Sequence, residues 1–122
     1  MKVLVVEDEP NNMTLMTRIL KHYGHEPIEA YTGTEGIEKT TSSKPDVVLM
    51  DLKLPDMEGF EATRRIRETN KNVPIIAVSS FSMDDIQEKF DCAQFNGYIQ
   101  KPVNSTTIMG EIKTIMALNI VF

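Results

Sequence analysis

Residues 47–51 read Val-Val-Leu-Met-Asp, four consecutive apolar side chains followed by a carboxylate. Residues 3–8 follow the same pattern with Val-Leu-Val-Val-Glu-Asp. Strands of a parallel sheet are buried on both faces, so their sequences are apolar on consecutive residues instead of alternating. The two stretches therefore predict central strands of a parallel sheet, at 3–6 and 47–50, each with acidic residues at its carboxyl end.

Three further segments complete the predicted sheet. Residues 74–78 are a third apolar run, whereas 26–30 contain Pro27 between charged side chains and 97–100 are mixed. Proline and exposed charge belong at the edge of a sheet. We therefore expect the strands, numbered along the chain, to lie in the spatial order 2-1-3-4-5.

Apolar residues at helical spacing separate these strands. Pro10 suits a first helical turn and Gly24 a helix end. In the third helix we expect Arg64, Arg65 and Arg67 to form a solvated face. Strict alternation of strand and helix predicts an α/β fold of the (βα)5 type, a doubly wound five-stranded parallel sheet like that of flavodoxin. The predicted helices cover residues 10–23, 33–42, 60–67, 84–93 and 104–118.

Length, composition and charge narrow the class of protein. The chain has 122 residues, 41% of them hydrophobic, which suits one domain over residues 1–122 with its own core. A lone cysteine, Cys92, excludes a disulfide framework and is expected to be buried as a small apolar residue. The apolar runs are far shorter than the roughly 20 residues of a membrane span, and no signal peptide is recognisable, so the expected compartment is the cytoplasm. A net charge of −5 argues against nucleic-acid binding.

Polar side chains gather where the predicted strands end. Open α/β sheets bind ligands outside the carboxyl ends of their strands, where the chain reverses direction between neighbouring strands. Four separate strands deliver groups to this edge, and we expect them to converge on one mouth. The groups are the carboxylates of Glu7, Asp8 and Asp51, the hydroxyls of Ser79 and Ser80, and the ammonium of Lys101.

Such a cluster predicts phosphoryl chemistry. Three carboxylates within a few ångströms repel one another unless a cation enters, and oxygen ligands favour Mg²⁺ or Mn²⁺. Lys101 is placed to pair with Asp51 at rest and with a phosphoryl oxygen after transfer, and Ser79 to donate a hydrogen bond to another oxygen. A metal and an ammonium that neutralise phosphoryl oxygens beside an Asp nucleophile are the groups that phosphoryl transfer requires.

Five segments also carry a resemblance to a known family. They are 3–8 (VLVVED), 47–55 (VVLMDLKLP), 56–59, 74–79 (PIIAVS) and 97–102 (GYIQKP), in order and at family spacing over essentially the whole chain. In these segments the chain resembles the receiver domain of two-component response regulators. The resemblance implies a signalling protein that catalyses only its own phosphorylation and dephosphorylation.

The resemblance also assigns roles at the mouth. It implies that Asp51 is the phosphoacceptor and that Asp8 and Asp51 ligate Mg²⁺ directly, together with the backbone carbonyl of Lys53. Glu7 would hold the metal through water. The segments therefore imply a phosphoaspartate site that depends on a divalent ion.

A second group of residues is implied to act as a switch. Ser79 would be the hydroxyl that follows the phosphoryl group, and Lys101 would pair with that group. Tyr98 would move inward when Ser79 is pulled toward the phosphate. The Lys101–Pro102 peptide bond is expected to be cis.

The resemblance implies protein partners. The donor would be a phosphohistidine on a sensor histidine kinase or a histidine phosphotransfer protein, and the output face would comprise residues 84–93, 97–100 and 104–118, acting on a downstream protein target. No nucleic acid or membrane is expected. We expect the donor to contact Asn11, Asn12, Leu15, Pro102 and Val103.

Other interpretations remain open at this point. The chain is expected to be a stand-alone receiver, but a receiver module excised from a hybrid histidine kinase reads almost the same. An aspartyl-phosphate phosphohydrolase would place its nucleophile after the first strand, whereas Asp51 follows the third. A degenerate receiver that only binds partners would normally lack Asp51 or Lys101.

The chain departs from the family pattern where the fourth helix ends. Gln94 and Phe95 occupy the place of the usual Gly-Ala pair. A residue other than glycine in a left-handed cap costs about 1 kcal/mol. We therefore expect the helix at 84–93 to end differently here.

Overall fold

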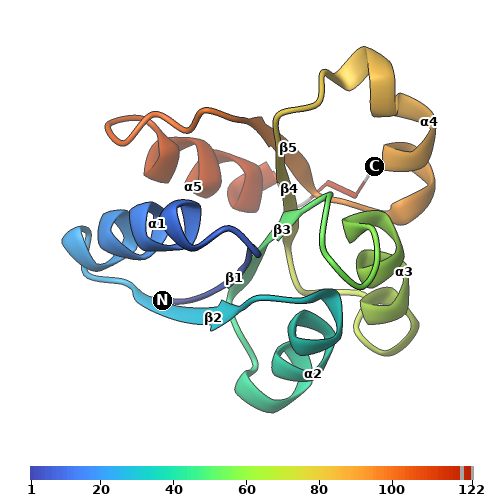
Figure 1. Cartoon of the computed structure of the whole chain (residues 1–122), viewed down its shortest axis with the longest axis horizontal. Coiled ribbons are helices and arrows are strands. Elements are labelled where there is room, and N and C mark those ends of the chain that lie inside the picture. Colours follow the sequence, from blue (N-terminus) through green and yellow to red (C-terminus); the bar gives the residue numbers. More distant parts are fainter. Residues whose placement is uncertain (119, 122) are drawn as a thin grey trace.

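The computed structural model describes residues 1–118, 120 and 121, in which strands and helices alternate along the chain (Figure 1). The predicted elements are all present, and most of their ends agree with the predicted ends to within one or two residues. The strands are β1 (Lys2–Val6), β2 (Glu26–Ala30), β3 (Val47–Asp51), β4 (Ile75–Ser79) and β5 (Gly97–Gln100), and the helices are α1 (Pro10–His22), α2 (Gly33–Ser43), α3 (Gly59–Thr69), α4 (Met83–Ala93) and α5 (Ile108–Leu118).

The five strands form one parallel sheet in the order β2-β1-β3-β4-β5, which confirms the predicted topology. In the central pair, Val3 lies opposite Val47 and Val6 opposite Met50. Because β1 and β3 run side by side in this register, the residues that follow Val6 and Met50 emerge at the same edge of the sheet.

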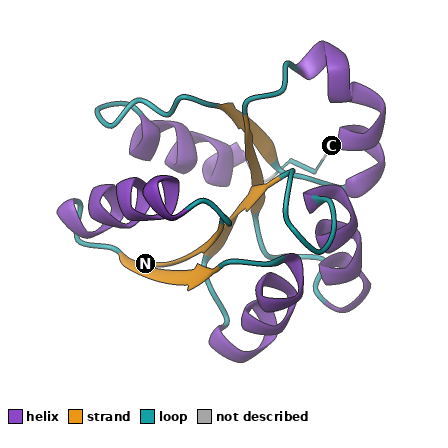
Figure 2. Ribbon diagram, viewed as in Figure 1, coloured by secondary structure: helices purple, strands orange, loops and turns teal. Residues whose placement is uncertain are grey.

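Helices cover both faces of the sheet (Figure 2). Helices α1 and α5 pack on one face, where they bury Val3, Val5 and Leu49. Helices α2, α3 and α4 pack on the other, where Leu4 and Met50 are buried. Successive strand side chains thus enter two different apolar clusters, which explains the consecutive apolar residues of the central strands. Among the described residues, each helix is too short or too polar to cross a lipid bilayer.

The start of α5 differs from the prediction, which placed it at residue 104. The helix begins at Ile108. The side-chain oxygen of Asn104 accepts hydrogen bonds from the N–H of Thr106 (2.9 Å) and from its hydroxyl (2.6 Å). Such local side-chain bonds compete with helical backbone bonds. Residues 104–107 therefore form turns ahead of the helix.

The prediction for Arg67 was wrong, because its side chain is buried, whereas Arg64 and Arg65 are exposed and pair with Glu61. The Arg67 guanidinium donates hydrogen bonds to the carbonyl oxygens of Gln94 (3.0 Å) and Val73 (2.7 Å) and to the side-chain oxygen of Asn96 (2.7 Å). A third carbonyl, that of Asn70, lies at 3.3 Å. A buried charge is tolerated when its hydrogen bonds are satisfied in this way.

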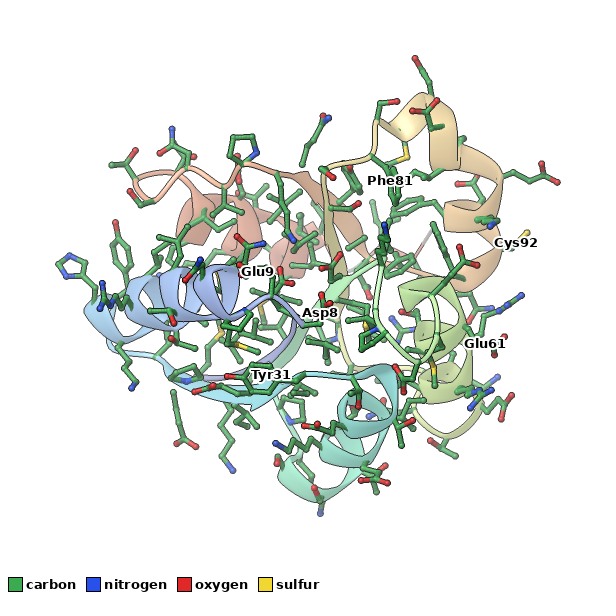
Figure 3. The ribbon with its side chains drawn as sticks, viewed as in Figure 1. Asp8, Glu9, Tyr31, Glu61, Phe81 and Cys92 are labelled. Carbon is green, nitrogen blue, oxygen red and sulfur yellow. The ribbon has the colours of Figure 1, made fainter. Side chains whose placement is uncertain are left out.

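The prediction for Cys92 was also wrong. Its side chain is exposed on the outer side of α4 (Figure 3). The buried positions of this helix are Ile86, Phe90 and Ala93. Cys92 lies two residues after Phe90, which turns it away from the core.

Helix α4 ends at Ala93, as its apolar periodicity indicates. The expectation that this helix ends differently from the family pattern was wrong. Gln94 adopts the left-handed conformation (φ 66°, ψ 50°) that glycine usually supplies. The next residue, Phe95, is fully buried and stacks on Phe90 with ring centroids 5.2 Å apart. Burial of Phe95 and the Arg67 bond to the Gln94 carbonyl offset the strain at Gln94.

The strain at Gln94 yields a stability prediction. Gln94→Gly is expected to raise the free energy of unfolding by about 0.5–1 kcal/mol, because about 1–2 kcal/mol of left-handed strain is removed and part of it is offset by the greater backbone entropy of glycine. Urea denaturation measures the change. Gln94→Ala is the matched control, since it retains Cβ and gains nothing. Equal stabilities of the two variants would contradict the expectation.

Candidate functional site

Three carboxylates meet at the edge of the sheet where β1 and β3 end. Glu7 and Asp8 follow β1, and Asp51 is the last residue of β3. Oxygens of the three side chains lie within 4.8 Å of one another. Glu7 and Asp51 are buried, whereas Asp8 is exposed and lies beside Glu9 at the start of the turn into α1 (Figure 3). The three carboxylates expected to converge therefore do so.

Lys101 reaches this cluster from the end of β5. Its Nζ lies 2.6 Å from Glu7 Oε1 and 3.3 Å from Asp51 Oδ2. The pairing with Asp51 was predicted, but the shorter contact with Glu7 was not. The sequence signal was that residue 7 is a glutamate, whose extra methylene lengthens its reach. The Lys101–Pro102 peptide bond is cis, as the resemblance implied.

The charges at this edge perturb one another. Burial raises the pKa of Glu7, and the hydrogen bond from Lys101 only partly offsets this effect. Burial lowers the pKa of Lys101, but the hydrogen bond to Glu7 and the charge of Asp51 outweigh it and raise this pKa overall. Lys101 is therefore an ammonium at neutral pH, and three carboxylates facing one ammonium leave an excess of negative charge.

The loop between β3 and α3 brings Lys53 to the same mouth. Its backbone N–H donates to Asp51 Oδ1 (3.2 Å), and the residue lines a cavity of about 400 Å³ together with the three carboxylates. The loop then folds back tightly: a Cβ on Gly59 would lie 2.1 Å from the backbone oxygen of Asp51. Glycine at position 59 permits this close return.

The donor set fits the divalent ion that the sequence implied. Carboxylate oxygens of Glu7, Asp8 and Asp51 lie within 4.8 Å of one another, and these three residues and Lys53 line one cavity. Oxygen ligands with an excess of negative charge suit hard cations such as Mg²⁺ and Mn²⁺. No soft nitrogen or sulfur ligand is among the described residues that line this cavity.

Ser79 and Tyr98 are connected through the loop that follows β4. Ser79 is buried, and its hydroxyl oxygen accepts a hydrogen bond from the N–H of Phe81 (3.2 Å). The Tyr98 hydroxyl lies within hydrogen-bond reach of two carbonyl oxygens, those of Ser79 (3.1 Å) and Phe81. Ser80 is exposed and lines the acidic cavity. A displacement of the Ser79 hydroxyl would therefore break a bond that holds the loop.

A second cavity, of about 260 Å³, opens beside the carboxylates, between α1 and the segment after β5. Its lining is largely apolar and includes strand residues such as Val5, Leu49 and Val78, which were predicted only as parts of strands. Four of the five expected donor contacts line it; Asn11 lies outside the lining, exposed on the first turn of α1. The four are Asn12, Leu15, Pro102 and Val103.

This combination of fold and site defines a class of protein, and sequence comparison identifies it. The sequence model of the response regulator receiver domain matches residues 3–113. The chain therefore belongs to the response regulator receiver domain family. Membership confirms the resemblance that the five segments indicated.

Similar proteins span nearly the same length. Protein PilH of Pseudomonas aeruginosa is 32% identical over 120 residues, which cover 95% of this chain and 98% of PilH. The polar-differentiation response regulator DivK of Brucella anthropi is 31% identical over 114 residues, covering 92% and 93% of the two chains.

Solved structures show the same arrangement. A CheY-like response regulator receiver domain from Methanospirillum hungatei superposes with a TM-score of 0.89 at 28% identity, covering 97% of this chain and 94% of the other. The receiver domain of the sensor histidine kinase PA1611 from Pseudomonas aeruginosa superposes with a TM-score of 0.87 at 28% identity, covering 95% and 97%. That structure has a magnesium ion coordinated in its active-site cleft.

Proposed function

We propose that residues 1–122 act as one receiver domain that accepts a phosphoryl group on Asp51 in a reaction that depends on Mg²⁺. The donor is a phosphohistidine on a sensor histidine kinase or a histidine phosphotransfer protein. The phosphorylated chain then passes the group on or controls a downstream protein through α4, β5 and α5. One observation carries the proposal: the carboxylates of Glu7, Asp8 and Asp51 meet the Lys101 ammonium at one edge of the sheet.

The transfer itself follows from this geometry. A carboxylate oxygen of Asp51 attacks phosphorus, and the bond from phosphorus to the donor imidazole nitrogen breaks, so the electron pair of that bond leaves with the imidazole. Lys101, 3.3 Å from Asp51 Oδ2, turns to a phosphoryl oxygen as the acyl phosphate forms. Asp8, Asp51 and the Lys53 carbonyl would hold Mg²⁺ directly and Glu7 through water, and the bound ion would neutralise charge on the phosphoryl oxygens.

The switch is a local change of charge. Phosphorylation turns a singly charged carboxylate into a group of about two negative charges. The Ser79 hydroxyl then gives up its hydrogen bond with the Phe81 N–H and donates to the phosphoryl group, so the loop after β4 shifts. The Tyr98 hydroxyl contacts the carbonyl oxygens of Ser79 and Phe81, and its side chain moves inward with this shift. Shifting a population from 1:99 to 99:1 requires about 5.5 kcal/mol. Two charge-assisted hydrogen bonds, at roughly 1.5–3 kcal/mol each, are of the required size.

Treatment with acetyl phosphate tests the function. With Mg²⁺ the intact mass is expected to rise by one phosphoryl group, and with a chelator it is expected to stay constant. A chain that gains no phosphoryl group with Mg²⁺ would be a degenerate receiver, and continuous turnover of a small phosphomonoester would indicate a phosphohydrolase. Either result would overturn the proposal.

The apolar cavity beside Asp51 leads to a prediction for the donor. Leu15 lines this cavity and is 46% exposed, so its side chain offers an apolar contact to a donor protein. Leu15→Ala is expected to slow transfer from a phosphohistidine protein about tenfold, since truncating an interface anchor typically costs more than 1 kcal/mol. Phosphorylation by acetyl phosphate is expected to be unchanged, because this small donor needs no docking surface.

Leu118→Ala is the matched control for this prediction, because Leu118 is 62% exposed at the end of α5. An alanine scan of Asn11, Asn12, Pro102 and Val103 extends the comparison. Unchanged transfer rates from the phosphohistidine protein in all these variants would remove the docking assignment. The proposed compartment is the cytoplasm, as expected from the sequence.

A further inference from the structure

Asp56, in the loop between β3 and α3, binds the first residues of α2 with both of its carboxylate oxygens. Oδ1 accepts a hydrogen bond from the N–H of Gly33 (2.8 Å). Oδ2 accepts one from the N–H of Thr34 (2.9 Å) and one from the Thr34 hydroxyl (2.7 Å). Three hydrogen bonds thus join two segments that are more than twenty residues apart in the chain.

The contact satisfies groups that a helix leaves unpaired. The first N–H groups of a helix have no partner within it, and the helix dipole favours a negative charge there. Thr32 caps the N–H of Glu35, while Asp56 takes those of Gly33 and Thr34. The Met57 side chain also packs closely against the start of α2, because a Cβ on Gly33 would lie 2.5 Å from Cγ of Met57. The tip of the loop is therefore seated on α2.

The loop anchored in this way carries the Lys53 carbonyl. At its base, Lys53 and Glu58 form an isolated antiparallel bridge, and the Gly59 N–H donates to the Leu52 carbonyl (2.9 Å). Nearer the tip, Leu54 is buried in the core. The three bonds of Asp56 attach the tip to the body of the protein through polar groups.

We propose that Asp56 is a positioning residue of the divalent-ion site: by tying the loop of residues 53–58 to α2, it holds the Lys53 carbonyl ready to act as a ligand. The inference rests on the proposed function, because it assumes that this edge of the sheet binds Mg²⁺. Mg²⁺ demands near-ideal octahedral geometry, so a ligand on a loosely held loop binds it less well. Losing a group that orients a metal ligand typically costs 10–100-fold in affinity.

The charge on Asp56 is present throughout the physiological range. Burial by itself raises the pKa of this carboxyl, but the hydrogen bonds from Thr34 and Gly33 outweigh burial and lower the pKa to about 2. A carboxyl whose pKa is lowered by folding stabilises the fold at pH values above its ordinary pKa, and this contribution is lost as the pH falls toward 2. The attachment to α2 is therefore constant near neutral pH.

Mn²⁺ titration followed by electron paramagnetic resonance of the free ion tests the proposal. Asp56→Ala is expected to raise the Mn²⁺ dissociation constant about tenfold, and Asp56→Asn to raise it less, because an amide oxygen still accepts a hydrogen bond. Hydrogen exchange of the Thr34 amide is expected to accelerate in the same order.

Asp46→Ala is the matched control. Asp46 also accepts a backbone hydrogen bond, from the N–H of Lys2 (2.7 Å), but it lies where β1 and β3 begin, at the end of the strands opposite to the carboxylates. It is expected to leave the Mn²⁺ dissociation constant unchanged. Urea denaturation of each variant separates loss of ion affinity from loss of fold, and Thr34→Val, which removes one bond, replaces Asp56→Ala if that variant does not fold.

The outcomes distinguish the two proposals. Wild-type protein that binds no Mn²⁺ would overturn the proposed function and the inference with it. If Asp56→Ala folds and binds Mn²⁺ with the same affinity as the wild-type protein, only the positioning role is overturned. The same conclusion follows from an unchanged affinity of Thr34→Val, if Asp56→Ala does not fold. An equal loss of affinity in Asp46→Ala would also overturn it, since the effect would then come from general destabilisation.

Discussion

Asp51→Asn is expected to take up no phosphoryl group from acetyl phosphate and Mg²⁺. The amide has nearly the same shape as the carboxylate but lacks the charged oxygen that attacks phosphorus. The Lys101 ammonium keeps its 2.6 Å contact with Glu7, so the edge of the sheet retains an ion pair in this variant. Intact mass measures the result, which is a complete loss and not a reduced rate.

A control for this loss is Asp84→Asn, because Asp84 is an exposed carboxylate in the first turn of α4. This variant is expected to gain one phosphoryl group at the wild-type rate. A phosphoryl group found on the Asp51→Asn variant and mapped to another side chain would contradict the assignment of Asp51.

Lys101→Met is expected to change two measurements in opposite directions. The Lys101 ammonium neutralises the same carboxylates that bind a divalent ion, so its removal is expected to strengthen Mn²⁺ binding. The increase in affinity is expected to be at least about tenfold, because the interaction energy of two charges in contact near a protein surface is several kcal/mol. Uptake of a phosphoryl group is expected to slow about 100-fold, because a positioned donor to the transferring group is lost. Methionine retains much of the length of the side chain, so packing changes little.

The matched control is Lys89→Met. Lys89 also pairs with a glutamate, Glu58, at 3.3 Å, but its side chain is 62% exposed. Exposed ion pairs contribute little, so neither measurement is expected to change by more than about twofold. Weaker Mn²⁺ binding in Lys101→Met would mean that the lysine supports the ion site instead of competing with it, and would contradict the expectation.

The topology was predictable because two rules of sheet architecture act on short segments. The consecutive apolar residues at 47–50 suit a strand covered on both faces, and the structure buries them between two helical layers. Pro27 and its charged neighbours suit an edge, and β2 is an edge strand. In both cases the residues that indicate the place of a strand in the sheet belong to that strand.

The errors concern side chains whose surroundings come from distant segments. Arg67 is long enough to reach the carbonyl oxygen of Gln94, just after α4, so its position on α3 did not indicate where its guanidinium lies. Cys92 is small and apolar, but its direction depends on how α4 packs. The Asn104 side chain bonds to Thr106, and α5 begins later in the chain than the apolar periodicity predicted.

For the site, the amino-acid sequence by itself determined which chemical groups stand at the strand ends, and the strand order brought Glu7, Asp8, Asp51 and Lys101 to one edge. Only the tertiary structure decided that Lys101 lies closer to Glu7 than to Asp51 and that Asp56 ties its loop to α2. The physical reason is one of scale. Strand order is set by burial summed over whole segments, whereas a hydrogen-bond partner is set by ångström differences between side chains that meet only once the chain has folded.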